Sequence, residues 1–330
     1  MTARADRSEQ RVGRRYPAAV IPTPAAVLHA IGRPLTQSSR PFPLRDRRAD
    51  PGLFGPDSVT WRVMREPLLL FGAGRALLMQ AAHPLVAQGA IDHSNYATDP
   101  FGRLERTVEW VTVVSFGTTA EAQRATRQVV ALHRHVRGRV PGGNATRKVP
   151  ARTAYTADDP ALLRWVHASF VDTMLATHDA LVGGLDDGER DAFVHEWDPV
   201  AALMGVPRRL LWRDVAALRA YVNRELTRGP ARPGAGSRLV ADTVLHPPVS
   251  SSSMRPAADV LGFIAVGLLP DVLRRGYGLT WTRAHAAGHR AIRVSLRSTR
   301  IALPRRMRVS PIYDLAVARS RGRWPEQIAA

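Results

Sequence analysis

Apolar residues recur at helical spacing along this chain from about Asp57 onward. Residues 66–90, EPLLLFGAGRALLMQAAHPLVAQGA, are the most apolar segment and predict a long buried helix that is kinked near Pro84. Arg75 argues against a membrane span, because a charge near the centre of a bilayer costs about 3 kcal/mol or more. We find no run of alternating residues that is typical of strands. The predicted fold class is all-α, with a single helical domain.

Further helices are predicted by their end signals. They are expected over residues 104–116, 119–137, 159 to the glycine pair at 183, from 187, 257–275 and 282–296, with a partly helical tail. Gly138 suits the C-cap of the second of these helices, and Asp159 and Pro160 suit the start of the third. Residues 228–256 are rich in Gly, Pro and Ser and predict a long loop.

The N-terminal residues 1–52 are rich in Arg, Pro and Ser and show no sustained period. They predict a partly disordered extension, with residues 53–330 forming the helical domain. The twin arginine Arg14–Arg15 precedes a weakly apolar run that prolines interrupt. We expect a cytoplasmic protein, while membrane association and twin-arginine export stay open.

Composition narrows the chemistry of any site. The chain of 330 residues has no cysteine, which excludes disulfides, cysteine zinc sites and thiolate-ligated haem. Its formal charge of +19 is typical of proteins that bind nucleic acid or an anionic membrane surface. However, only Lys148 among the 47 basic residues is a lysine, and the arginines are spread along the chain. We therefore expect no nucleic acid partner, and peripheral membrane contact remains open.

The stretch ALHRHVRG holds the first candidate metal ligand, His133. The apolar stripe of the helix predicted over 119–137 consists of Ala122, Ala125, Val129, Leu132 and Val136. His133 lies about 60° from the middle of this stripe, at its border, whereas Arg134 and His135 face solvent. His133 can therefore reach into an apolar interior. A packed histidine at the edge of the core is the alternative that the spacing leaves open.

The preceding helix offers a complementary set of polar groups. Arg103, Arg106, Thr107 and Trp110 share one face at i, i+3, i+4 and i+7. Two guanidinium groups and a hydroxyl beside an apolar stripe can hold carboxylates or polarise a bound oxygen species. The alternative is a solvated face that pairs with neighbouring glutamates.

Other histidines rank lower. His83 precedes a proline and His93 lies in the turn IDHSNYATDPFG, so either residue can line a pocket or have a structural role. His285 and His289 have the i, i+4 spacing of two zinc ligands but lack the glutamate of H-E-x-x-H, and we do not expect a metal there.

Several segments in order resemble one known family. They are GAGRALLMQAAHPLVAQGAIDHSNYATDPFGRLERT, ALHRHVRG, YTADDPALLRWVHASF, MGVP, LLPDVLRRGYGLTW and LPRRMRVSPIYDLAVAR. From about Trp61 to Arg319 the chain resembles the haem-dependent oxygenases that include latex clearing proteins and the fungal MpaB oxygenase. The resemblance implies a globin-like helical core that holds haem b, with O2 bound opposite a proximal histidine.

The resemblance also implies roles for individual residues. The family's proximal histidine, in its H-x-x-V-x-G pattern, falls on His133, and its distal Arg-x-x-Lys-Thr motif falls on Arg103, Arg106 and Thr107. Arginine replaces the distal lysine, and because Arg106 stays protonated it does not ligate iron. Arg106 is instead expected to bind a distal oxygen or a propionate. Arg103 and His83 complete the cofactor-binding candidates.

The resemblance further implies an oxygenase that acts on a hydrophobic substrate, such as an isoprenoid or another alkene-bearing molecule. Two alternatives stay open at this point. One is a non-enzymatic basic protein that binds an anionic membrane surface or nucleic acid, and the other is a protein that only senses or stores haem.

Overall fold

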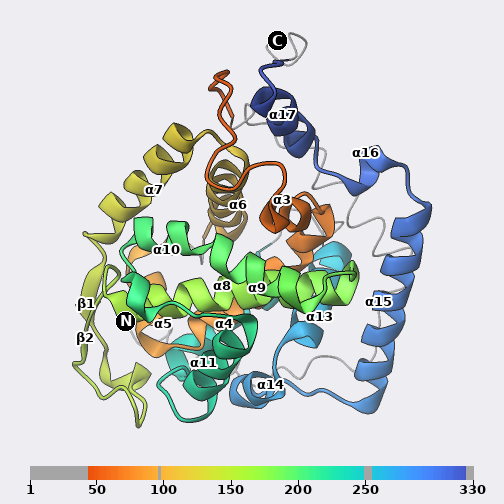
Figure 1. Cartoon of the computed structure of the whole chain (residues 1–330). Helices are drawn as coiled ribbons and strands as arrows, with labels where there is room; N and C mark the ends of the chain where they lie inside the picture. The colour runs from red at the N-terminus through yellow and green to blue at the C-terminus, as the bar shows by residue number, and fades with distance from the viewer. Residues whose placement is uncertain (1–43, 96–97, 249–254, 325–330) are drawn as a thin grey trace.

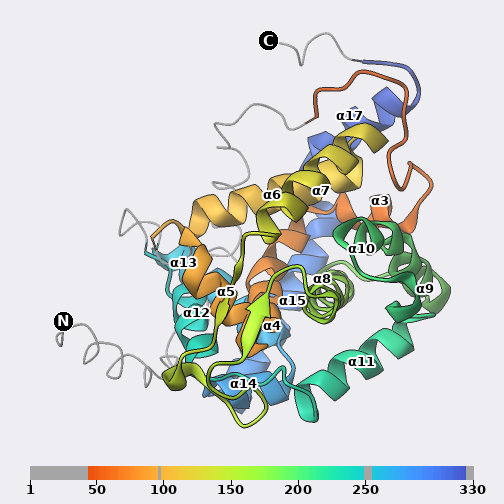
Figure 2. The same cartoon turned by 90° about the vertical axis from the view of Figure 1, so that its left-hand side faces the viewer.

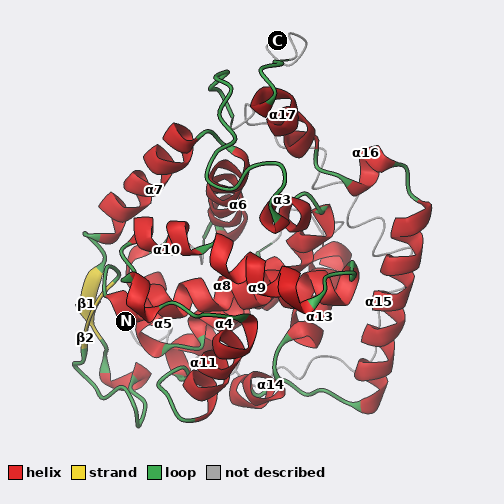
Figure 3. Cartoon of the chain, in the orientation of Figure 1, coloured by secondary structure: helices red, strands yellow, loops and turns green. Residues whose placement is uncertain are grey.

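The computed structural model describes residues 44–95, 98–248 and 255–324, and it is built almost entirely of helices (Figures 1 and 3). The α-helices are α3 (Val59–Met64), α4 (Ala73–Ala81), α5 (Pro84–His93), α6 (Pro100–Phe116), α7 (Thr119–His133), α8 (Pro160–Leu181), α9 (Asp187–Glu196), α10 (Asp198–Met204), α11 (Val215–Thr227), α12 (Ala235–Leu245), α13 (Arg255–Leu268), α14 (Asp271–Tyr277), α15 (Arg283–Ala302), α16 (Arg305–Arg308) and α17 (Pro311–Ser320). Short 3-10 turns are η1 (Pro67–Gly72), η3 (Gly142–Asn144) and η4 (Arg208–Leu210). The prediction of a single all-α domain is confirmed.

The helix α8 forms the centre of the molecule, and Figure 2 shows it end-on with other helices around it. Asp159 caps it by accepting a hydrogen bond from the backbone N–H of Ala161, and Pro160 occupies the first turn, as predicted. Its buried side chains belong to a core that also holds large aromatic rings. The largest fully buried side chains include Trp61, Trp165, Trp197, Phe193 and Phe263.

The apolar segment predicted as one long helix is divided into η1, α4 and α5. The second break falls at residues 82–83, directly before Pro84, where a kink was predicted. The first break follows from close packing, because a Cβ on Gly72 would lie 2.4 Å from Oγ1 of Thr177 on α8. Within the three described ranges, no helix has both the length and the apolarity needed to cross a membrane.

Three other predicted boundaries are wrong. The helix that begins at residue 119 ends at His133, and Gly138 lies in a strand instead of a C-cap. This strand, β1 (Arg137–Arg139), pairs antiparallel with β2 (Ala154–Thr156), and Gly138 is opposite Tyr155. Residues 228–256 contain α12 in place of a long loop, and the helix predicted over 257–275 is split before Pro270, which N-caps α14.

The described part of the N-terminal extension packs against the body. Leu44 is buried, and the backbone N–H groups of Arg45 and Asp46 donate to Oε1 of Glu121 at 2.7 and 2.8 Å. Nη1 of Arg319 lies 3.6 Å from the other oxygen of the same carboxylate. Residues 1–43 lie outside the described residues, so the division at residue 52 stays a prediction.

A buried guanidinium ties three helices of the core together. Arg75 on α4 donates from Nη2 to Oδ2 of Asp172 at 2.6 Å and from Nη1 to the hydroxyl of Thr173, both on α8. Its Nε donates to the carbonyl of Leu268, the last residue of α13, at 2.9 Å. The ion pair is almost fully buried, so removal of either partner leaves an unpaired charge in the core.

We expect Asp172→Ala to lower the free energy of unfolding by about 3–5 kcal/mol, because the Arg75 charge then stays buried without a carboxylate. Urea denaturation monitored by tryptophan fluorescence measures this loss. The matched control is Asp187→Ala, which removes a 97% exposed carboxylate paired with Arg190 and should cost less than about 1 kcal/mol. Equal losses in the two variants would contradict the role of the buried pair.

Candidate functional site

The helices α6 and α7 form an antiparallel hairpin that brings the predicted site residues to one end. Figure 2 shows the two helices side by side, joined at Gly117–Thr118. Arg103 lies 13 residues before Phe116, and His133 lies 14 residues after Thr119. Because each helix rises about 1.5 Å per residue, the two side chains lie at similar heights. The turn of the hairpin is buried, and we call the other end, with Arg103 and His133, the open end.

His133 is the last residue of α7 and is half-buried. Burial lowers the pKa of its imidazole, and the carboxylate of Asp158 opposes this effect only in part. The ring is therefore neutral at pH 7, with a nitrogen lone pair that can bind a metal. Arg134 and His135 are exposed, as the spacing predicted.

The apolar stripe of α7 is only partly covered, in contrast to the prediction that it faces the interior. Ala122 is buried, but Leu132 is 67% exposed, and Phe101 at the start of α6 is 40% exposed. The reason is that α7 packs on α6 and α10, while its last turn extends past the core. The open end therefore presents apolar surface with a neutral imidazole at its border.

Arg103 and Thr107 line a small hollow beside α6. The other lining residues are apolar or neutral and come from α4, α6 and α12: Leu77, Pro100, Leu104, Val240, Thr243 and Val244. The free space is about 30 Å³, which is room for a molecule the size of water or O2. The hydroxyl of Thr107 donates to the carbonyl of Arg103 at 3.0 Å. The hollow thus places a guanidinium and a hydroxyl in an apolar ring.

Arg106 lies apart from this hollow. It is exposed, and its Nη1 is 3.5 Å from Oδ2 of Asp99. Asp99 also caps α6, because its Oδ1 accepts from the backbone N–H of Gly102 at 2.9 Å. The structure therefore joins Arg103 with Thr107 and leaves Arg106 at the solvent-exposed rim.

Sequence reasoning missed the residues of α12 and a polar contact behind His133. The hydroxyl of Tyr155 donates to Oδ2 of Asp92 at 2.5 Å, and burial together with this carboxylate raises the pKa of Tyr155. A Cβ on Gly138 would lie 2.6 Å from the hydroxyl of Tyr155. This packing requires glycine at position 138, for a reason that spacing alone does not reveal.

Two histidines near this contact have structural partners. Nε2 of His93 shares a hydrogen bond with the carbonyl of Arg137 at 3.0 Å, which ties α5 to β1. The side chain of His83 is buried and caps α5, since its Nδ1 accepts from the backbone N–H of Leu85. Burial lowers the pKa of His83 to about 4. A contact of His83 with a cofactor stays a prediction.

His285 and His289 are buried in α15, where both rings contact Phe263 and Trp281. Across the described ranges, no group of three or more His, Asp or Glu side chains could jointly hold a metal ion. A haem iron needs only one axial protein ligand. The donor set at the open end fits this need: a neutral imidazole, uncovered apolar surface and arginines that can pair with propionates.

Comparison with known proteins adds a family. The family model "ER-bound oxygenase mpaB/B'/Rubber oxygenase, catalytic domain" matches residues 61–298. Uncharacterized proteins of Mycobacterium bovis and Mycobacterium tuberculosis are each 29% identical over 154 residues, which are 46% of this chain and 57% of the relative. The match thus spans little more than half the length of these relatives. No solved structure matches the chain significantly.

The buried cap of α5 predicts a pH dependence of stability. Above pH 6.5 His83 is neutral in both the folded and the unfolded state. Between pH 6.5 and about 4 only the unfolded state takes up its proton, so the free energy of unfolding falls with pH. We expect His83→Asn, which keeps a capping oxygen, to remove up to about 3 kcal/mol of this loss at pH 4.

Urea denaturation at pH 7, 5.5 and 4.5 measures the effect as the difference between variant and wild type. The control is His135→Asn, because His135 is exposed and should leave the pH profile unchanged. A His83→Asn profile parallel to that of the wild type would show that His83 is not the titrating group.

Proposed function

The chain belongs to the family of mpaB and rubber oxygenase catalytic domains, and from this membership we propose that it is a haem b-dependent oxygenase of a hydrophobic substrate. The observation that carries the proposal is the α6–α7 hairpin, which holds His133 and Arg103 at one end. Both residues stand where the family's proximal histidine and distal arginine fall. The proposed substrate class is an isoprenoid or another alkene-bearing molecule.

His133 is the proposed axial ligand of the haem iron. Its imidazole is neutral at pH 7 because burial lowers its pKa, so no proton has to leave before it binds. Its place at the C-terminus of α7, before the turn at residues 134–135, lets the ring reach past the end of the helix. The exposed apolar side chains of Leu132 and Phe101 supply surface that a flat macrocycle can cover.

Arg103 and Thr107 are the proposed distal groups. When bound, haem b supplies the iron at which O2 is activated. The Arg103 guanidinium would donate hydrogen bonds to negative charge that develops on oxygen, within a hollow whose apolar lining excludes bulk water. Thr107 would hold the backbone of α6 at that position, since its hydroxyl is bonded to the Arg103 carbonyl.

Arg106 receives a different role from that of the family's lysine. Its side chain is exposed and lies near Asp99 at the rim, and a permanently protonated guanidinium pairs well with a carboxylate. We therefore propose that Arg106 contacts a propionate in place of an oxygen species. A protein that stores haem would share all these contacts, so product analysis with O2 and an alkene is needed to separate storage from catalysis.

The first expected outcome concerns haem binding. We expect purified protein supplemented with haem to show a Soret band, and His133→Ala to lose most of it because the axial ligand is gone. Absorption spectra of the free and desalted proteins measure the retained haem. The matched control is His135→Ala, which removes an exposed imidazole two residues away and should keep the band. Full retention of haem by His133→Ala would reject the axial role.

The second expected outcome concerns the reaction itself. We expect Arg103→Ala to keep the Soret band and to slow alkene-dependent O2 consumption about 100-fold or more, as for loss of one oxyanion donor. Arg106→Ala serves as the control, with a reduced haem affinity and a smaller effect on turnover of the bound fraction. Turnover of Arg103→Ala equal to that of wild type would remove Arg103 from the distal site.

A further inference from the structure

One face of α15 combines exposed arginines with exposed apolar side chains. The inner face of this helix is anchored in the protein, because Ile292 and Leu296 are buried and Arg300 forms a two-toothed ion pair with Glu66. The outer face has a regular order. Arg283, Arg290 and Arg297 repeat at intervals of seven, and Ala287, Val294 and Ile301 each follow four residues later. All six are exposed.

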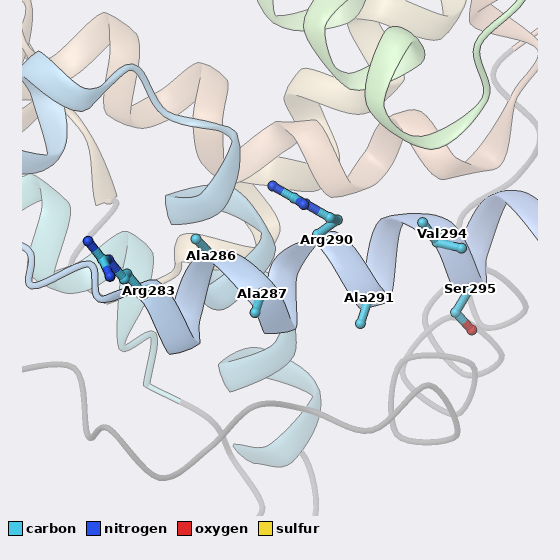
Figure 4. Close-up of a pocket in the computed structure, with 7 residues that line it drawn as sticks. All are labelled: Arg283, Ala286, Ala287, Arg290, Ala291, Val294 and Ser295. Carbon is cyan, nitrogen blue, oxygen red and sulfur yellow. The ribbon is translucent and has the colours of Figure 1, made fainter.

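On a helix this spacing produces two adjacent rows, one basic and one apolar. Figure 4 shows the helix with Arg290 and Val294 on one side and with Ala287 and Ala291 on the other. The small side chains border an open hollow of about 700 Å³ that α15 lines. We call this outer side of α15, together with α16, the outer face.

The outer face concentrates apolar exposure. Val294 is 59% exposed, Ile301 74% and Met307 57%. These are three of the eight large apolar side chains that are exposed among the described residues, and they lie within 14 residues of sequence. Exposed apolar residues gathered in this way mark contact surfaces on soluble domains.

The same stretch carries a strong positive charge. Residues 283–313 hold eight arginines and no Asp or Glu. Arg300 is neutralised by Glu66, and Arg305 by Asp314. In the described part of the chain, no acidic partner is found for Arg283, Arg290, Arg297 or Arg306. These four arginines therefore leave a net positive field beside the apolar row.

We propose that the outer face docks on an anionic phospholipid bilayer. A helix that lies in the headgroup plane needs cations for the lipid phosphates and apolar side chains that enter the acyl boundary, and α15 offers both in adjacent rows. Nucleic acid would use the arginines but not Val294, Ile301 and Met307. A second copy of this face would set arginines against arginines. The proposal is independent of haem or oxygenase activity.

The test is co-sedimentation of the full chain with vesicles of phosphatidylcholine alone or with about one third phosphatidylserine, at about 0.1 M and 0.5 M salt. We expect wild-type protein to bind the phosphatidylserine vesicles at low salt and to lose most binding in the other conditions. Each arginine at an anionic surface strengthens binding about fivefold. The triple variant Arg283→Gln/Arg290→Gln/Arg297→Gln should therefore weaken binding at least tenfold.

Two more variants separate the contributions. Val294→Ser/Ile301→Ser removes apolar contact without changing charge and should weaken vesicle binding several-fold. Arg124→Gln/Arg209→Gln/Arg232→Gln removes three exposed arginines elsewhere and should bind as wild type. All substituted side chains are exposed, so thermal melts should coincide and exclude misfolding.

Several results would overturn the proposal. They are absence of wild-type binding to phosphatidylserine vesicles, equal binding to both vesicle types, and equal losses in the two triple variants. Unchanged vesicle binding by Val294→Ser/Ile301→Ser, combined with tight binding of wild type to duplex DNA that the α15 triple variant loses, would assign the face to nucleic acid. Haem content and turnover are measured separately, so failure here leaves the proposed function untouched.

Discussion

The buried Arg75–Asp172 pair is the contact on which the arrangement of the core depends. A guanidinium inside a protein is tolerated only when all its donors find acceptors, and Arg75 meets this requirement with groups from α8 and the end of α13. These groups have one relative position in which all are satisfied. The pair therefore sets how α4, α8 and α13 cross, more specifically than apolar packing alone does. Leu77, two residues further along α4, lines the hollow beside Arg103, so the site inherits this geometry.

The hairpin of α6 and α7 shows how far sequence reasoning extends. Both starts were accessible, because Asp99 and Thr118 are good caps and Pro100 begins a helix well. The border position of His133 followed from helical angles and agrees with its half-buried state. The end of α7 was misjudged, since HVRG continues a helical pattern. The competing influence is the pairing of β1 with β2, which lies beyond local sequence.

The parts that could not be predicted depend on contacts between distant residues. Gly138 looked like a helix cap, but its real constraint is the ring of Tyr155, 17 residues later. The helix α12 lies in a segment rich in Gly and Pro, where propensity argues for a loop and tertiary packing on α4 and α5 decides for a helix. Its Val240 and Val244 complete the hollow, so the loop prediction also hid half of the site. Leu132 failed for the opposite reason, because a periodic apolar position does not say whether anything covers it.

The contacts of Glu121 have a consequence for how this chain can be extended. Its carboxylate accepts from the backbone at Arg45 and Asp46 and lies near Arg319, so both ends of the described chain meet beside the turn of the hairpin (Figure 1). The open end with His133 lies at the opposite tip of α6 and α7. Additional domains, affinity tags or a covalent linker between the termini can therefore be attached there without obstructing access to the imidazole. The architecture separates the places where the polypeptide tolerates growth from the place where chemistry is proposed.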